Sequence, residues 1–252
     1  MFYGLTSDEQ RRKLKTAITL MTEIYPRIFS GDHLITVERC MSFLDDDRFM
    51  HAYDRNAVTD QEKTLIWRLH TLAWAARHGS HLPGDFVECG VYQGFCSAVL
   101  LEYLDFGTLQ KQRTYYLYDT FTGIPDGYQD ATRTEHNPTD EPGLIDRVTE
   151  RFRAYPNVRI VPGIVPEVFN SGQVPEQIAF LHLDMNSAKA ELGALDWLFA
   201  RVVAGGIVIF DDYGWWAYRN QQQQENEFMR RLGYTILELP TGQGLVVKRH
   251  GG

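Results

Sequence analysis

The sequence contains little cysteine. Its three cysteines among 252 residues, Cys40, Cys89 and Cys96, form no CxxC pair. This excludes a fold held together by disulfides and a zinc site with the usual paired cysteines. Charged residues also precede any apolar run in the opening MFYGLTSDEQRRKLK, which is not typical of a signal peptide. We therefore expect a cytoplasmic protein.

Long apolar runs and an excess of basic residues are missing too. No stretch approaches the ~18 consecutive apolar residues that a membrane-spanning helix needs. The chain has 25 Lys and Arg against 33 Asp and Glu, a formal net charge of -8. Because nucleic acid binding depends on a basic surface, this balance disfavours it. We expect neither a membrane nor a nucleic acid as partner.

The first eighty residues have the pattern of helices joined by polar turns. Residues 6–9, TSDE, are a typical helix start, and residues 61–78 follow Asp60 with leucines at helical spacing. Between them, the charged and aromatic residues 44–56 are interpreted as a solvated loop or as a flap over a site. The sequence thus predicts a helical extension or lid over residues 1–80.

After residue 84 the pattern changes to short apolar runs that alternate with amphipathic stretches. Strands are expected at residues 85–89, 114–118, 158–161, 177–183 and 206–210, with helices at 95–104, 144–154, 188–202 and 219–232. This alternation predicts a doubly wound, mostly parallel α/β sheet over residues 81–252. The last runs, 234–239 and 245–248, predict an antiparallel hairpin at the edge of the sheet.

Acidic residues and glycines follow the first two predicted strands, where an open α/β sheet binds its ligands. The turn after the first strand reads ECGVYQG from Glu88 to Gly94. Tyr92 replaces the second glycine of a dinucleotide fingerprint, which disfavours a nicotinamide oxidoreductase. Glu88 suits a cationic ligand, and Asp119 at the end of the second strand suits the two hydroxyls of a ribose. These residues favour S-adenosylmethionine as cofactor; a turn cap is the alternative role for Asp119.

Carboxylates also follow the fourth and fifth predicted strands. Asp184 and Asn186 end one strand, and Asp211 and Asp212 end the next. Like charges at close range must be offset, and oxygen ligands suit Mg²⁺ or another divalent cation. Such a cation makes a bound hydroxyl lose its proton more easily. We therefore expect Asp184, Asp211 and Asp212 to bind a metal; helix capping by Asp184 and a turn at Asp212 are the alternatives.

Four segments of the sequence are informative as a set. They are FVECGVYQGFCS at 86–97, YLYDTFTGIPDG at 116–127, LHLDMN at 181–186 and VVAGGIVIFDDYG at 202–214. Together they resemble the macrocin/mycinamicin O-methyltransferase family (TylF type). The resemblance implies a Rossmann-like, seven-strand class I methyltransferase sheet with an antiparallel last strand. It also implies Mg²⁺-dependent methyl transfer from S-adenosylmethionine to a hydroxyl of a sugar, glycoside or phenol, in secondary metabolism or polysaccharide biosynthesis, by a homo-oligomer such as a dimer.

The resemblance also assigns residues by position. It implies that Asp184, Asp211 and Asp212 are the metal ligands. The cofactor is expected to contact Glu88, Gly90, Val91, Tyr92, Ser97, Asp119, Thr120, Phe121, Gly163 and Asp184.

The catalytic residues are expected to be Asp184, Asn186 and His182. Several family members carry a second aspartate, the proposed general base, at the position of Asn186. An asparagine can orient a hydroxyl but cannot take its proton. His182, Lys189 and His51 are the remaining candidates for the base, and a buried, hydrogen-bonded histidine is the alternative for His182.

Aromatic residues follow the last pair of acids. Trp215, Trp216 and Tyr218 suit stacking on a sugar or another planar acceptor, or packing against the lid. His136 lies in a loop that we expect to border the acceptor pocket. Two further functions remain open: a metal-independent small-molecule methyltransferase, and a non-catalytic S-adenosylmethionine-binding protein of the same fold, for which Asn186 is the main argument.

Overall fold

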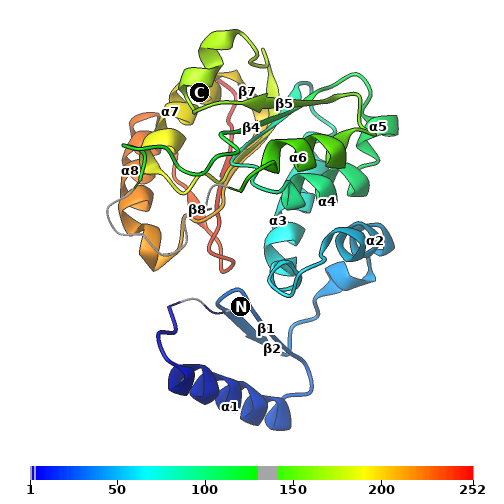
Figure 1. The fold of residues 1–252 in the computed structure, drawn as a ribbon, viewed down its shortest axis with the longest axis vertical. Coiled ribbons are helices and arrows are strands. Elements are labelled where there is room, and N and C mark those ends of the chain that lie inside the picture. The colour runs from blue at the N-terminus through cyan, green and yellow to red at the C-terminus, as the bar shows by residue number, and fades with distance from the viewer. Residues whose placement is uncertain (1, 3, 130–140, 252) are drawn as a thin grey trace.

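A seven-stranded β-sheet forms the centre of the protein in the computed structural model, which describes residues 2, 4–129 and 141–251 (Figure 1). The strands are Asp85–Cys89 (β3), Tyr115–Asp119 (β4), Val158–Pro162 (β5), Ile178–Leu183 (β6), Val202–Phe210 (β7), Leu237–Glu238 (β8) and Gly244–Val247 (β9). Their order in the sheet is β5-β4-β3-β6-β7-β9-β8. The first five strands in this order are parallel, and β9 is antiparallel to both β7 and β8. The predicted doubly wound sheet with an antiparallel last pair is confirmed.

The strand order reverses direction between β3 and β6. From β3 the chain proceeds outward through β4 to β5, then returns to the other side of β3 to form β6 and β7. The two connections leave a crevice at the carboxyl ends of β3 and β6, which is where open α/β sheets bind ligands. The predicted site residues of both strands therefore meet at one place.

Helices cover both faces of the sheet (Figure 1). They are Ile66–Gly79 (α3), Phe95–Tyr103 (α4), Phe106–Leu109 (α5), Leu144–Phe152 (α6), Ala188–Leu198 (α7) and Arg219–Arg231 (α8), with short 3₁₀ helices at Glu62–Thr64, Glu167–Ser171, Phe199–Arg201 and Trp216–Tyr218. One buried apolar cluster joins the sheet to α3, α4 and α6, and a second joins it to α7 and α8. Because β6 contributes to both clusters and is buried along its whole length, its sequence is apolar except for His182.

The N-terminal part contains an element that the sequence analysis missed. Besides the helix Asp8–Ile24 (α1) it has a hairpin of Ile28–Gly31 (β1) and Leu34–Val37 (β2), followed by a 3₁₀ turn at Ser42–Asp45 and the helix Asp47–Asn56 (α2). The hairpin turn consists of Asp32 and His33, both with positive φ, and lacks the glycine that usually marks such a turn.

The loop predicted for residues 44–56 is wrong, because most of this range forms α2. The side chain of Asp46 accepts hydrogen bonds from the backbone N–H groups of Arg48 and Phe49 and so caps the helix. Phe49 and Tyr53 lie on its buried face. The division of the chain at residue 80 stays a prediction; α3 itself packs on β6 and β7.

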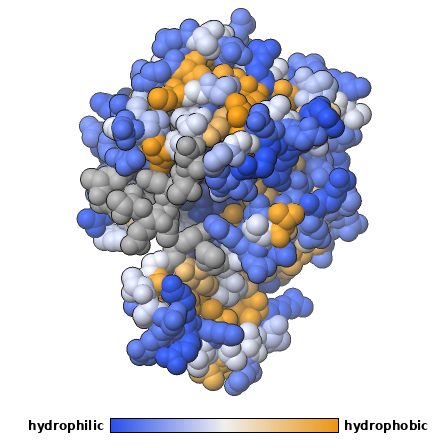
Figure 2. All heavy atoms as spheres, in the orientation of Figure 1, coloured by the Kyte–Doolittle hydropathy of each residue, from blue (hydrophilic) through white to orange (hydrophobic). Residues whose placement is uncertain are grey.

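The surface of the protein is mixed in character. Figure 2 shows hydrophilic residues over most of the face in view, with apolar residues in separate groups. Helix α1 buries none of its residues and leaves Leu20 and Ile24 exposed. Within residues 2, 4–129 and 141–251, none of the helices has both the length and the apolar character needed to cross a membrane.

Candidate functional site

A cavity of about 660 Å³ opens at the carboxyl ends of β3, β4, β6 and β7. The predicted cofactor residues on its lining are Glu88, Gly90, Val91, Tyr92, Asp119, Thr120, Gly163 and Asp184. The other two, Ser97 and Phe121, are buried and do not appear on this lining. The cavity also receives Asn186, Asp211 and Asp212. The fold thus brings most of the predicted residues around one space.

Close backbone contacts shape the glycine turn after β3. A Cβ atom at Gly90 would lie 1.8 Å from the carbonyl oxygen of Asp184, so only glycine fits there. Tyr92 has a left-handed backbone with a φ of 48°. Its hydroxyl donates to Oε1 of Glu141 at 2.5 Å. The turn is therefore held both against β6 and by a side chain near its tip.

Asp119 ties the end of β4 to the same turn. Its Oδ2 accepts hydrogen bonds from the backbone N–H groups of Val91 at 2.6 Å and Tyr92 at 2.8 Å. Its Oδ1 accepts from the N–H of Phe121 at 2.7 Å. The carboxylate has a structural role and also faces the cavity, so a turn cap and a ligand contact are compatible at Asp119.

A buried chain of polar side chains lies beneath the cavity floor. Nδ1 of His182 lies 3.0 Å from Oε1 of Glu88, and the hydroxyl of Ser97 donates to Oε2 of Glu88. On the other side, Nε2 of His182 lies 3.5 Å from Oδ1 of Asp211. Gln243 donates to the same oxygen of Asp211 at 2.8 Å. These contacts join β3, β6, β7 and β9 across the sheet.

The charges in this chain follow from its contacts. Although burial lowers the pKa of His182, its hydrogen bonds to Asp211 and Glu88 and their charges raise it to about 10. Burial opposes the ionisation of Asp211, but Arg68 and His182 hold its pKa below the usual range. Burial raises the pKa of Glu88, and the hydrogen bond from His182 opposes this rise. At neutral pH His182 is therefore protonated and donates, so it has no free lone pair with which to take a proton.

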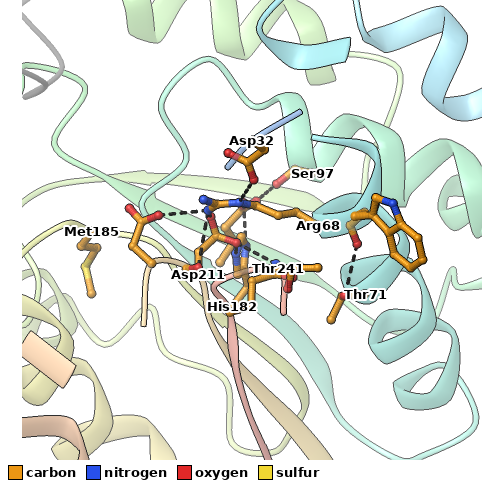
Figure 3. A network of polar contacts seen from close by, with 12 residues as sticks. Asp32, Arg68, Thr71, Ser97, His182, Met185, Asp211 and Thr241 are labelled. Carbon is orange, nitrogen blue, oxygen red and sulfur yellow. Dashed lines mark hydrogen bonds and ion pairs between the residues drawn. The ribbon is translucent and has the colours of Figure 1, made fainter. Parts of the chain in front are cut away.

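Arg68, which belongs to α3, lies among three carboxylates (Figure 3). Its Nε donates to Oδ2 of Asp32 at 2.6 Å. Its Nη1 donates to Oδ2 of Asp211 and, at 3.0 Å, to Oδ1 of Asp212. The guanidinium carbon lies 4.8 Å from the ring centre of Trp215. Burial lowers the pKa of Arg68, but the three carboxylates outweigh this and raise it, so the side chain is a permanent buried cation.

Three of the residues around the cavity floor could hold a metal ion. Ligand atoms of His182, Asp184 and Asp211 lie within 4.8 Å of one another, and His182 would join the two carboxylates as a ligand only after losing its proton. Burial and the nearby charges of Asp211 and Asp212 raise the pKa of Asp184 well above its usual value, a repulsion that a cation would relieve. Carboxylate oxygens are the ligands that Mg²⁺ prefers, so the donor chemistry fits this ion. Asp212, the remaining predicted ligand, lies outside this group of three and accepts from Arg68.

The candidates for the general base lie in different surroundings. Asn186 lines the cavity and has a left-handed backbone with a φ of 55°. Lys189 is exposed, and its Nζ lies 3.8 Å from the ring centre of Tyr128. His51 is exposed on α2, with Nε2 at 3.3 Å from Oε1 of Glu102. Neither Lys189 nor His51 lines the cavity.

The aromatic residues after β7 divide into three environments. Trp215 lines the cavity and contacts the ring of His33, with the ring centres 4.7 Å apart. Trp216 is 79% exposed, and Tyr218 is buried. His136 lies outside the described residues.

Sequence reasoning missed Arg68, Asp32 and Gln243. A signal for Arg68 was available: it stands on the stripe of α3 that also carries Leu65, Leu69 and Leu72, where a charged residue needs a buried partner. Asp32 gave no comparable signal, because the hairpin that carries it was not recognised. Gln243 was read only as part of a turn.

Solved structures with the same fold define the class of the protein. The structure of the O-methyltransferase NovP matches with a TM-score of 0.61 and 22% identity, over 73% of this chain and 81% of that one. The calicheamicin methyltransferase CalS11 matches with a TM-score of 0.59 and 16% identity, over 83% and 93%. The fold is thus that of the class I methyltransferases, with its Rossmann-like sheet and antiparallel last strand.

Sequence comparison is more specific. The profile of the macrocin-O-methyltransferase (TylF) family matches residues 66–232, and the chain belongs to this family. Demethyldecarbamoylnovobiocin O-methyltransferase of Streptomyces niveus is 30% identical over 145 residues, 54% of this chain and 55% of that protein. A second relative is 8-demethyl-8-(2,3-dimethoxy-alpha-L-rhamnosyl)-tetracenomycin-C 4'-O-methyltransferase of Streptomyces olivaceus. It is 30% identical over 146 residues, which cover 52% of this chain and 54% of that protein. The chain spans about half the length of the curated relatives it matches.

Proposed function

We propose that the protein is an S-adenosylmethionine-dependent O-methyltransferase that methylates a hydroxyl of a sugar or of a small glycoside. One observation carries the proposal: in a chain of the TylF family, a single cavity is lined by the glycine turn, by Asp119 and by the acids after β6 and β7. The turn and Asp119 form a cofactor end, and the acids form an end at which a hydroxyl can be bound. The two relatives described above, both O-methyltransferases, support this assignment.

S-adenosylmethionine fits the cofactor end by charge and by shape. Gly90 lets the turn pack directly against the backbone of Asp184, which holds the turn at the edge of the cavity. Glu88 and Asp184 place carboxyl groups near the expected position of the sulfonium and the ammonium group, whose positive charge would favour the ionised form of both. Oδ1 of Asp119 accepts one of the described backbone N–H groups, that of Phe121. This oxygen therefore has room to accept from a ribose hydroxyl as well. Gly163 after β5 would lie beside the adenine.

The charge of the cavity favours a neutral acceptor. Among the described residues that line the cavity, acidic side chains outnumber basic ones. The basic side chain is Arg68, and the acidic ones are Asp32, Glu62, Glu88, Asp119, Asp184, Asp211 and Asp212. Although the proposed divalent cation would offset part of this charge, the remaining field disfavours the diphosphate of a nucleotide-linked sugar, because clefts lined by one sign of charge focus the potential. A glycoside or a phenol carries no such charge. Trp215, whose ring contacts Arg68 and His33, lines the cavity and would border the acceptor.

A divalent cation belongs to the proposal as well. Asp184, Asp211 and Asp212 would hold it, with His182 behind Asp211. When bound, it would lower the pKa of an acceptor hydroxyl. Asn186 would orient that hydroxyl without taking its proton, and His182, which donates to Glu88 and lies 3.5 Å from Asp211, would help to fix the direction of both carboxylates. With the hydroxyl oxygen held ~3 Å from the methyl carbon, the oxygen–carbon bond would form as the sulfur–carbon bond breaks. S-adenosylhomocysteine would leave, and the hydroxyl proton would pass to water.

One observation favours a metal-independent methyltransferase as second candidate: Arg68 already neutralises charge at Asp211 and Asp212. Labelled S-adenosylmethionine should be incubated with the protein and a panel of neutral glycosides, phenols and nucleotide sugars, with Mg²⁺ or with EDTA. We expect transfer to a neutral glycoside that EDTA abolishes and Mg²⁺ restores. Full transfer in EDTA would select the metal-independent enzyme. Binding of S-adenosylhomocysteine without transfer to any acceptor would support a non-catalytic binding protein, and no binding would refute the proposal.

We also propose that the protein forms a homodimer or a larger homo-oligomer. The support is the exposure of Leu20 and Ile24 on α1, a helix without buried residues. Light scattering coupled to size exclusion tests this, since a monomer at micromolar concentration would contradict it.

A further inference from the structure

Arg68 occupies the position of a bound cation. Its Nη1 donates to one oxygen of Asp211 and one of Asp212, and its Nε donates to Asp32 (Figure 3). The side chain is 8% exposed and stacks on Trp215. It therefore does for Asp211 and Asp212 what a metal ion does for clustered carboxylates, because it offsets their repulsion with positive charge.

The same two carboxylates belong to the proposed metal site, and this creates a conflict. Both oxygens of Asp211 already accept from the protein: Oδ2 from Arg68, and Oδ1 from Gln243, with His182 facing the same atom. A divalent cation at these oxygens would stand next to a guanidinium in a site with little water to screen them. Two cations at such a distance repel strongly, so they cannot share the site without a shift of Arg68.

Such a shift would reach the N-terminal hairpin. Asp32 and His33 form the turn between β1 and β2, and Asp32 is buried against Arg68. His33 contacts the ring of Trp215, over which the guanidinium lies. The tip of the hairpin is thus held to the acids after β7 through Arg68.

We propose that Arg68 is a built-in cation that competes with a divalent cation for Asp211 and Asp212, and that binding of the divalent cation loosens the hairpin tip. The inference rests on the proposed function, from which it takes the divalent cation. It goes further because it names Arg68 as the residue that sets the affinity for that cation. A residue that merely supports the site would act in the opposite sense, because its removal would weaken cation binding.

The test is the affinity of the full-length protein for Mn²⁺ alone, measured by electron paramagnetic resonance of the free ion. Arg68→Met should bind Mn²⁺ about tenfold or more tightly than the wild type, since a competing charge is gone. Arg77→Met is the matched control: Arg77 is on the same helix, 64% exposed, and its loss changes the net charge equally. We expect its affinity to equal that of the wild type. Equal or weaker binding by Arg68→Met, an equal gain in Arg77→Met, or no Mn²⁺ binding by any of the proteins would overturn the inference.

Arg68→Lys covers the case in which Arg68→Met does not fold. A single ammonium group cannot bridge Asp32 and Asp211 as the guanidinium fork does, so Mn²⁺ should bind this variant more tightly than the wild type, by a smaller factor. Unchanged or weaker binding would count against the competition.

Hydrogen exchange in the hairpin provides an independent readout. In the wild type, exchange at residues 28–37 should rise when Mg²⁺ is added; in Arg68→Met it should be high already and insensitive to Mg²⁺. Exchange that does not respond in the wild type would overturn the coupling to the hairpin. Binding of S-adenosylhomocysteine, measured on the same samples, separates a failure of this inference from a failure of the proposed function.

Discussion

Replacement of Asp119 tests the cofactor end of the site most directly. The carboxylate accepts three backbone hydrogen bonds, from Val91, Tyr92 and Phe121, and also faces the cavity. In Asp119→Asn one of the two oxygens becomes an NH₂ group, which cannot accept from any of these donors. The variant should therefore lose both structural hydrogen bonds and contacts to the ribose.

The two losses have different magnitudes and are measured separately. A hydrogen bond to a charged group contributes about 1.5–3 kcal/mol, so the dissociation constant for S-adenosylhomocysteine should rise roughly 10–150-fold in calorimetry. For stability we expect a loss of about 1–2 kcal/mol, because Asp119 is partly exposed and one oxygen remains. At about 2–4 °C per kcal/mol for a chain of this size, Tm should fall by about 2–8 °C.

Asp85→Asn is the control for the structural part of this effect. Asp85 starts β3 at the opposite end of the strand and accepts the backbone N–H of Thr114 at 2.7 Å. Its replacement should lower Tm without changing the affinity for S-adenosylhomocysteine. If folded Asp119→Asn binds S-adenosylhomocysteine as tightly as Asp85→Asn does, the assignment of Asp119 to the ribose is refuted.

Two further predictions concern the helices behind the site and the glycine turn. Burial, and then the charge of Glu225 on α8, raise the pKa of Glu191 on α7 well above its usual value. The native state therefore holds this proton more tightly than the unfolded chain, and stability falls as the pH rises above the usual pKa of glutamate. In thermal unfolding, Glu225→Gln should stabilise the protein by about 1–2 kcal/mol more at pH 8 than at pH 5. Glu227→Gln, which replaces an exposed residue of the same helix, should not have this effect. A gain in stability that is independent of pH would contradict the prediction. Gly90→Ala should abolish binding of S-adenosylhomocysteine, because the new Cβ would lie 1.8 Å from a backbone carbonyl oxygen. Gly172→Ala is the control, since Gly172 has a similar positive φ but no atom within 4 Å of a Cβ, and this variant should bind normally. Equal binding by both variants would contradict the prediction.

The central sheet could be predicted because its strands are encoded locally. The segment of β6 is buried on both faces, so its apolar run identifies it without reference to the rest of the chain. The hairpin of β1 and β2 could not be identified in this way. Its strands have four residues each and are only partly buried, and its turn of Asp32 and His33 lacks glycine.

The same distinction applies to the site. Glu88, Asp119 and Asp184 lie at or just after the carboxyl ends of strands, and the rule that ligands bind at strand ends was enough to bring them together. The contacts of Arg68 join positions 36 and 143 residues apart, and no local pattern carries that information. The glutamine run 221–224 has the same limit, because a run of one residue type gives no period from which to find the buried side of the helix: Gln221 is 1% exposed, whereas Gln223 and Gln224 are exposed.

The acids around the cavity differ in what offsets their charge, and this difference sets the order in which a cation can bind. Backbone N–H groups stabilise Asp119, and Arg68 and His182 stabilise Asp211, whose pKa lies below its usual range. Asp184 is the opposite case: burial and its acidic neighbours raise its pKa well above the usual value, so a cation gains most there. Binding should therefore begin at Asp184 and spread to Asp211 only as Arg68 withdraws. For the divalent cation of the proposed function, contact with Asp211 therefore requires that Arg68 first release this carboxylate.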